Sequence, residues 1–275
     1  MITKLQKKVG INVLTFFICY ILNMRKIQIG NCTLYNGDCY EVLKHIEDNS
    51  VTLVHSDPPY VVHSGVQKSE WYEKIGVNKQ QESLDNAGIS NGFDIESVFY
   101  ELVRICKTPN YQLWCSKKQF PVLLNYAIDN GYSWQDIMLY RNNALPNLNG
   151  KYQDKDYCIH MWKGRKITGE YKDRVTDYHW NIGGKKEWNH PALKPIEPII
   201  HMLKVGSDEG DVVLDMFMGS GTTGDACLKT NRKFIGIEKN DLFFEMAVKR
   251  IGKVFDWHHT QGDPLELVFP YLLLF

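Results

Sequence analysis

Apolar and polar residues along the chain follow two patterns, one with the period of a β-strand and one with that of an α-helix. Short β-branched and apolar runs predict strands at residues 25–29, 33–35, 51–54, 111–115, 134–140, 157–162, 212–215 and 234–238. Apolar residues spaced three and four positions apart predict helices at residues 39–46, 95–107, 120–130, 198–205, 224–231 and 242–254. Strands that alternate with helices indicate an α/β fold with a mostly parallel, twisted sheet and helices on both faces.

The N-terminal segment differs from the rest of the chain. Residues 13–22 form a largely apolar run of ten behind three lysines, and no small-x-small cleavage site follows it. A helix that spans a bilayer needs about 20 residues, so this run is too short. The first domain-like strand begins directly after Met24. We therefore expect residues 1–23 to be an extension outside the catalytic core, residues 24–275 to form a single domain, and no segment to cross a membrane.

The composition is that of an ordinary globular protein. Hydrophobic residues make up 44% of the 275, and 32 Lys and Arg balance 32 Asp and Glu, which excludes a polybasic coat and an acidic disordered chain. Residues 141–194 nevertheless hold eleven basic and six acidic side chains, so one surface could meet a polyanion. The seven cysteines are scattered, without a Cys-x-x-Cys pair or zinc-finger spacing. This pattern predicts reduced thiols, a cytoplasmic protein and no metal site.

A glycine-rich loop joins the strand at 212–215 to the next helix. Gly219, Gly221 and Gly224 satisfy the pattern G-x-G-x-x-G, and Glu238 ends the following strand, nineteen residues after Gly219. This arrangement fits a dinucleotide-binding loop, with an acidic residue for ribose hydroxyls. An NAD-dependent dehydrogenase is therefore one candidate.

Two side chains beside this loop favour a different ligand. Asp215 ends the strand before the loop, where its carboxylate would face a pyrophosphate unfavourably but would suit an ammonium or sulfonium group. Phe217 adds an aromatic wall. S-adenosylmethionine carries an ammonium, a sulfonium, a ribose and an adenine, so it matches these groups.

A second motif follows the strand at 51–54 and consists of Asp57, Pro58, Pro59 and Tyr60. The amino group of an aromatic base is a poor nucleophile, because its lone pair is delocalised into the ring. A carboxylate and a rigid backbone carbonyl beside proline can accept hydrogen bonds from both N–H groups and activate the nitrogen. Tyr60 offers a face on which an extruded base can stack.

Together these motifs resemble the beta-class DNA amino-methyltransferases, which methylate exocyclic amino groups of adenine or cytosine. The matching segments occur in the order of that class: 37–38, 57–60, 190–195, 215–221 and 238. The acceptor motif precedes the glycine loop, as in the permuted DNA enzymes. The resemblance implies a Rossmann-like S-adenosylmethionine-dependent methyltransferase fold over roughly residues 25–250. One departure is Met216, where the family usually has proline.

The resemblance also implies roles for the matched residues. The catalytic residues would be Asp57, Pro58, Pro59 and Tyr60. The methionine end of S-adenosylmethionine would be lined by Asp215, Phe217, Gly219, Ser220, Gly221 and Thr222. Glu238 would bind the ribose and Asp38 the adenine amino group, and the segment with Lys194 and Pro195 would close over the cofactor.

The expected substrate is an amino group in double-stranded DNA. No Pro-Cys pair occurs, so a thiolate attack on a cytosine ring carbon is disfavoured and direct in-line methyl transfer to a flipped base is expected. An aspartate at the head of the motif resembles the adenine-modifying members, which favours N6-adenine, with N4-cytosine as the alternative. Basic and aromatic residues at 141–190 predict an inserted target-recognition region. A DNA-binding remnant without activity is disfavoured, whereas a cognate restriction enzyme and a homodimer are left open.

Overall fold

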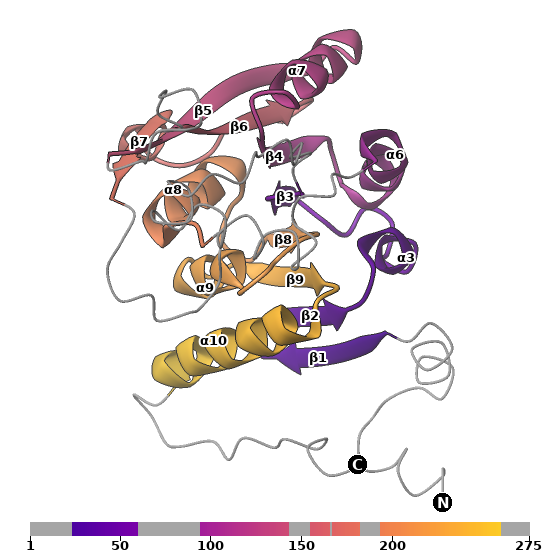
Figure 1. Ribbon diagram of the computed structural model, residues 1–275, viewed down its shortest axis with the longest axis vertical. Coiled ribbons are helices and arrows are strands. Elements are labelled where there is room, and N and C mark those ends of the chain that lie inside the picture. The colour runs from indigo at the N-terminus through magenta and orange to yellow at the C-terminus, as the bar shows by residue number, and fades with distance from the viewer. Residues whose placement is uncertain (1–23, 60–93, 143–154, 166, 182–192, 260–275) are drawn as a thin grey trace, which may run out of the picture.

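The computed structural model describes residues 24–59, 94–142, 155–165, 167–181 and 193–259. Within these ranges the strands form one nine-stranded sheet in the order β1-β2-β9-β8-β3-β4-β6-β5-β7 (Figure 1). Their bounds are β1 Arg25–Ile29, β2 Cys32–Asn36, β3 Leu53–Ser56, β4 Asn110–Cys115, β5 Ser133–Arg141, β6 Lys155–Trp162, β7 Asp177–Trp180, β8 Val212–Asp215 and β9 Lys233–Glu238.

Most neighbouring strands in this sheet are parallel. The exceptions are β1 against β2, and β6 against both β4 and β5. The fold is therefore α/β with a mostly parallel sheet, as the alternation of strands and helices predicts. The central strand β3 has four buried residues and lies between β8 and β4, as expected for a parallel strand that is covered on both faces.

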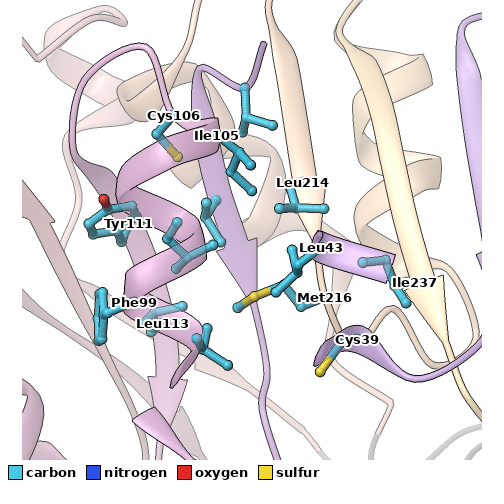
Figure 2. Close-up of a cluster of buried hydrophobic side chains, with 14 of the residues drawn as sticks. Cys39, Leu43, Phe99, Ile105, Cys106, Tyr111, Leu113, Leu214, Met216 and Ile237 are labelled. Atoms are coloured by element: carbon cyan, nitrogen blue, oxygen red, sulfur yellow. The ribbon is translucent and has the colours of Figure 1, made fainter. Parts of the chain in front are cut away.

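Helices cover both faces of the sheet (Figure 1). One face carries α3 Cys39–Leu43, α6 Ile95–Ile105 and α7 Phe120–Asp129, and the other carries α8 Ile196–Gly206, α9 Thr222–Lys229 and α10 Asp241–His259. Figure 2 shows part of the first interface, where Leu43, Phe99 and Ile105 from the helices meet Leu113 and Leu214 from the strands. Burial of these apolar side chains on both faces is the main stabilising contribution to such a layered fold.

The structure adds elements that the sequence pattern did not predict. Strand β7 and a single 3-10 turn, η1 Tyr171–Asp173, lie in the basic stretch after residue 163. β7 is short and pairs in parallel with β5, Tyr178 opposite Leu139 and Trp180 opposite Arg141. The extension predicted at residues 1–23 lies outside the described residues. Of the helices described here, none is long and apolar enough to cross a membrane.

Met24 belongs to the core of the domain. Its side chain is 6% exposed and packs in the same apolar cluster as Val42 and Leu43. The domain therefore includes Met24 itself, one residue before β1 begins.

Candidate active site

Four acidic side chains lie along the carboxyl edge of the sheet. Asp38 follows β2, Glu238 ends β9, Asp215 ends β8 and Asp57 follows β3. These four strands are neighbours in the order β2, β9, β8, β3, and each pair is parallel, so their carboxyl ends meet at one edge. The fold thus brings the acceptor motif and the glycine loop together. Crevices at this edge of open α/β sheets are the usual place for ligands.

Asp215 is the most deeply buried member of this acidic row. The residue is 4% exposed, and its carboxylate accepts hydrogen bonds from Ser56 Oγ at 2.7 Å, Thr223 Oγ1 at 2.6 Å and Phe217 N at 3.1 Å. Burial raises the pKa of Asp215 to about 6, although the three donors act in the opposite direction. A cationic group placed nearby would favour the ionised carboxylate.

Glu238 fixes the start of the glycine loop. Its Oε2 accepts a hydrogen bond from Gly219 N at 2.9 Å, and its Oε1 accepts one from Asn240 N at 2.7 Å. Burial raises the pKa of Glu238 to about 7. The Glu238 side chain therefore holds the glycine loop against the end of β9. It is also a second carboxyl group with a raised pKa near Asp215.

Two glycines of the loop have backbone conformations that favour glycine. Gly219 has φ +51° and Gly221 has φ +79°, and a Cβ atom on Gly221 would lie 3.0 Å from Cβ of Ala247 on α10. Ser220 between them is buried. Thr222 begins α9, and its Oγ1 accepts a hydrogen bond from Arg250 at 2.8 Å, so this hydroxyl is directed to α10.

Asp38 lies at the other end of the row from Asp57. Its Oδ1 caps α3 by accepting from Tyr40 N at 3.0 Å, and its Oδ2 accepts from Lys239 Nζ at 2.8 Å. The preceding residue, Gly37, donates its N–H to the carbonyl oxygen of Glu238 at 3.0 Å. Asp38 and Glu238 are therefore held together through the ends of β2 and β9.

Asp57 makes a close ion pair with Lys194. Lys194 Nζ lies 2.6 Å from Asp57 Oδ2, and the two side chains are 13% and 25% exposed. Pro195 follows as the N-cap of α8. Pro58 is buried and Pro59 half-buried, and Gln119 Nε2 donates to the Pro59 carbonyl oxygen at 3.3 Å. Tyr60 lies outside the described residues, so its predicted stacking role stays a prediction.

The comparisons with known proteins agree with this arrangement. A family model described as DNA methylase, for N6 and N4 methyltransferases, matches residues 51–249 and so includes the motifs at Asp57 and at Gly219. The chain belongs to this DNA methylase family. The beta-class resemblance is confirmed, and the dehydrogenase alternative is wrong, because the glycine loop is part of the methylase match.

The most similar relatives of this DNA methylase include two bacterial enzymes. The chain is 24% identical over 254 residues to the type II methyltransferase M2.LlaDCHI of Lactococcus lactis subsp. cremoris, covering 81% of this chain and 90% of the relative. It is 26% identical over 249 residues to the type II methyltransferase M.HinfI of Haemophilus influenzae, covering 81% of this chain and 68% of that protein.

Solved structures of methyltransferases share the fold of this DNA methylase. The structure of an M1.HpyAVI–SAM complex has a TM-score of 0.56 at 22% identity and covers 80% of this chain and 99% of its own. The PvuII DNA methyltransferase, described as cytosine-N4-specific, has a TM-score of 0.61 at 16% identity, with 83% and 92% covered. The Rossmann-like methyltransferase fold is therefore confirmed.

Met216 has a partner that proline could not have. Its backbone N–H donates to Ser56 Oγ at 3.1 Å, and its side chain is buried in the core cluster shown in Figure 2. Proline lacks this N–H. The departure from the usual family sequence thus adds a hydrogen bond between the glycine loop and β3. Phe217, the next residue, is half-buried against the same cluster.

The basic stretch at 141–190 divides into parts with different positions. β6 is an inner strand of the sheet, and because it runs antiparallel to β4, residues beyond its C-terminal end lie at the edge opposite Asp57. Arg165 lies at that opposite edge, within 3.6 and 3.7 Å of Asp208 and Asp211. The target-recognition region at 141–190 stays a prediction, and residues 143–154, 166 and 182–190 of it lie outside the described residues.

Several side chains at the site were not predicted from the sequence. Two hydroxyl groups, of Ser56 and Thr223, donate to Asp215, and the Gln119 amide donates to the Pro59 carbonyl. Trp114 lies under Lys194, whose Nζ is 5.3 Å from the ring centroid. Ser56 precedes the acceptor motif directly, and Thr223 lies inside the glycine motif, so their positions in the sequence offered a signal. Trp114 and Gln119 had none, because strand pairing and a turn bring them to the site.

Proposed function

We propose that this DNA methylase transfers a methyl group from S-adenosylmethionine to the N6 amino group of adenine in double-stranded DNA. The observation that carries the proposal is the order of the acidic row: Asp38, Glu238, Asp215, Asp57. This order matches the sequence of groups expected for the adenine, the ribose, the cationic end of the donor and the target amino group.

The residues present fit such a donor. S-adenosylmethionine, when bound, supplies an activated methyl group on a cationic sulfur. Two carboxyl groups with raised pKa, the buried Asp215 and the half-buried Glu238, flank a glycine turn, and carboxylates of this kind are stabilised by a cation and by hydroxyl donors. Asp38 lies beyond Glu238, where an adenine amino group would follow a ribose.

Asp57 supplies the acceptor for the target amine. A carboxylate has about four lone-pair sites, so it can accept from Lys194 and also from an amino N–H. The rigid Pro58–Pro59 backbone presents carbonyl oxygens beside it, and Gln119 holds the Pro59 end of this loop. Acceptors on both N–H groups draw the nitrogen toward tetrahedral geometry and expose its lone pair to the methyl group.

The thiols near this site do not support covalent catalysis. Burial raises the pKa of Cys115 to about 12, and Cys158 is fully buried with its pKa raised well above the usual value. A thiol in that state is a weak nucleophile at neutral pH. This favours direct transfer to an amino group over attack through a cysteine adduct.

Adenine is favoured over cytosine because aspartate, not serine, heads the acceptor motif. Base flipping follows from the need to bring the amino group out of the stack to Asp57. The type II methyltransferases among the relatives suggest that this enzyme works in a restriction-modification system, with a cognate restriction enzyme as partner. A homodimer is a further proposal of the same kind.

The test is incorporation of labelled methyl groups into duplex DNA, followed by separation of the modified nucleosides. We expect N6-methyladenine from the wild type and none from Asp57→Ala, which should still bind S-adenosylmethionine. Label on cytosine alone would make N4-cytosine the substrate, while label on RNA or protein alone would refute the proposed function. Sequencing of modified bases in host DNA would then give the recognition site.

A further inference from the structure

Lys194 occupies an unusual position for a residue expected to contact the cofactor. Its ammonium group lies 2.6 Å from Asp57 Oδ2 and above the ring of Trp114, so it faces the acceptor motif. Burial lowers the pKa of Lys194, but the carboxylates of Asp57 and Asp156 outweigh this, and the net pKa is raised. Lys194 therefore remains a cation at neutral pH and does not act as a base.

A chain of directed hydrogen bonds supports the ring beneath this cation. Trp114 Nε1 donates to His55 Nε2 at 3.3 Å, His55 Nδ1 pairs with Gln112 Oε1 at 2.9 Å, and Gln112 Nε2 donates to the carbonyl oxygen of Met202 on α8 at 2.8 Å. The indole N–H can only donate, and the Gln112 amide nitrogen is already directed to a carbonyl. His55 must therefore carry its proton on Nδ1 and accept on Nε2.

The protonation state of His55 agrees with this assignment. The ring is 1% exposed, and burial lowers its pKa to about 4, so it is neutral at physiological pH. A neutral imidazole has one donor and one acceptor nitrogen, which matches the two bonds that the ring makes. The chain from α8 to Trp114 thus has a single direction and fixes the indole ring in place.

We propose that Lys194 is a positioning residue that holds the Asp57 carboxylate in its acceptor orientation, and that Trp114, His55 and Gln112 anchor Lys194 to α8. The inference rests on the proposed function, because it assigns Lys194 to the acceptor amine and not to the cofactor. A lone aspartate carboxylate can rotate about its last bond. A charge-assisted hydrogen bond to Oδ2 fixes the plane of the carboxylate and so the direction of its remaining lone pairs.

Four variants test the pair directly. Lys194→Met removes the positive charge but keeps the length of the side chain, and Lys194→Arg keeps a cation. Asp57→Asn removes the negative charge, and its combination with Lys194→Met removes both charges. The measurements are the S-adenosylmethionine dissociation constant by calorimetry, the single-turnover methylation rate on duplex DNA, and the thermal unfolding midpoint of each variant.

We expect Lys194→Met to lower the single-turnover rate by about 100-fold, as for a misplaced catalytic group, with cofactor affinity unchanged. Lys194→Arg should recover at least about tenfold of that loss, since the cation is restored. The double variant should be no slower than Asp57→Asn alone, because the two side chains act on one acceptor and their effects are not additive.

Trp114→Phe tests the anchoring chain. It keeps an aromatic ring under Lys194 but removes the N–H that His55 accepts, so a smaller fall in rate, about tenfold, is expected with cofactor affinity unchanged. Lys194→Met removes the positive charge beside Asp57 and could fail to fold for that reason. In that case Trp114→Phe provides the test, since it changes no charge.

Different results separate the inference from the proposed function. Weakened cofactor binding with an unchanged transfer rate in Lys194→Met would return Lys194 to the cofactor and overturn the inference. So would a wild-type rate in both Lys194→Met and Trp114→Phe. A wild-type protein that binds S-adenosylmethionine but methylates no DNA would overturn the proposed function itself, and this inference with it.

Discussion

The hydroxyl of Ser56 donates to Asp215 Oδ1 across 2.7 Å, although 159 residues separate the two in the chain. The same oxygen of Ser56 accepts the N–H of Met216 at 3.1 Å. Ser56 ends β3, directly before the acceptor motif, and Asp215 ends β8, directly before the glycine loop. One hydroxyl group therefore couples the position of the methyl acceptor to that of the loop expected to hold the methyl donor.

Ser56→Ala is expected to weaken both stability and cofactor binding. The change leaves the buried Met216 N–H without its acceptor and Asp215 with one donor fewer, a cost of about 1–3 kcal/mol in the free energy of unfolding. Urea unfolding and calorimetry with S-adenosylmethionine measure the two effects. Ser50→Ala, in an exposed turn where Ser50 Oγ donates to the Glu47 carbonyl, is the matched control and should be nearly neutral. Equal effects of both changes would contradict the coupling.

Glu238→Ala is expected to reduce S-adenosylmethionine affinity by about 1–3 kcal/mol, because two ribose hydroxyls lose their acceptor. Glu238→Ala also removes the acceptor for the Gly219 N–H. In Glu238→Gln the amide oxygen can still accept that hydrogen bond, so this variant should lose less affinity. Isothermal titration measures both. Glu209→Ala, an exposed residue in the turn before β8, should bind as the wild type does. Unchanged affinity in Glu238→Ala would remove this residue from the cofactor site.

Cofactor affinity is expected to rise with pH. The pKa values of Asp215 and Glu238 are raised to about 6 and about 7, so both groups are largely protonated at pH 5.5 and ionised at pH 7.5. A cationic, hydroxyl-bearing ligand prefers the ionised forms, which predicts at least about tenfold tighter binding across this range. Calorimetry at several pH values tests this. Glu238→Gln should remove the part of the rise near pH 7 and leave the part near pH 6.

The same two groups should make the free energy of unfolding of the ligand-free protein fall as pH rises, opposite to the trend in cofactor affinity. A carboxyl group with a raised folded-state pKa stabilises the fold fully at pH values below its ordinary pKa, and that contribution is lost as pH rises through the raised value. The contribution of Asp215 is therefore lost progressively from its ordinary pKa of 3.8 up to about pH 6, and that of Glu238 from 4.5 up to about pH 7. Comparing urea unfolding of the wild type and Glu238→Gln between pH 4 and 8 isolates one of the two.

A chain that begins at Met24 is expected to fold and to methylate DNA as the full chain does, because residues 1–23 contain none of the site residues. Met24 itself is needed, since its side chain is 6% exposed in the apolar core. Met24→Ala should cost about 2–5 kcal/mol of unfolding free energy, as for other large-to-small core changes. Thermal and urea unfolding check both statements. Insolubility of the shorter chain would place part of residues 1–23 in the domain.

Local patterns in the sequence predicted much of this fold. The strand at 212–215 has the predicted bounds, because a β-branched run followed by an acid and a glycine turn allows little else. The strand predicted at 51–54 is displaced to Leu53–Ser56, since its pairing with β8 and β4 decides its extent. β7 was not predicted because it has only four residues in a basic, turn-rich stretch, although its aromatic residues Tyr178 and Trp180 do alternate with polar ones.

The site was predicted in its motifs but not in its contacts. Asp215 and Glu238 stood out because each ends a strand beside glycines. The pairing of Lys194 with Asp57 could not be predicted, because it joins side chains 137 residues apart through the packing of α8 on the sheet. His55 lay just beyond the strand predicted at 51–54 and Gln112 within the one at 111–115, and only the register that places them opposite each other makes them a pair.

The pairing of β2 with β9 has a consequence for how the protein is made. Asn36 and Glu238 lie side by side in the sheet although 202 residues separate them. Contacts of such long sequence separation slow folding, because the intervening chain must first be brought into a compact form. During synthesis the β1–β2 hairpin leaves the ribosome early and keeps an unpaired edge until β9 follows. The edge of the sheet that holds all four acids is therefore completed only when residue 238 has been made, so the site cannot form before β9 is available to pair with β2.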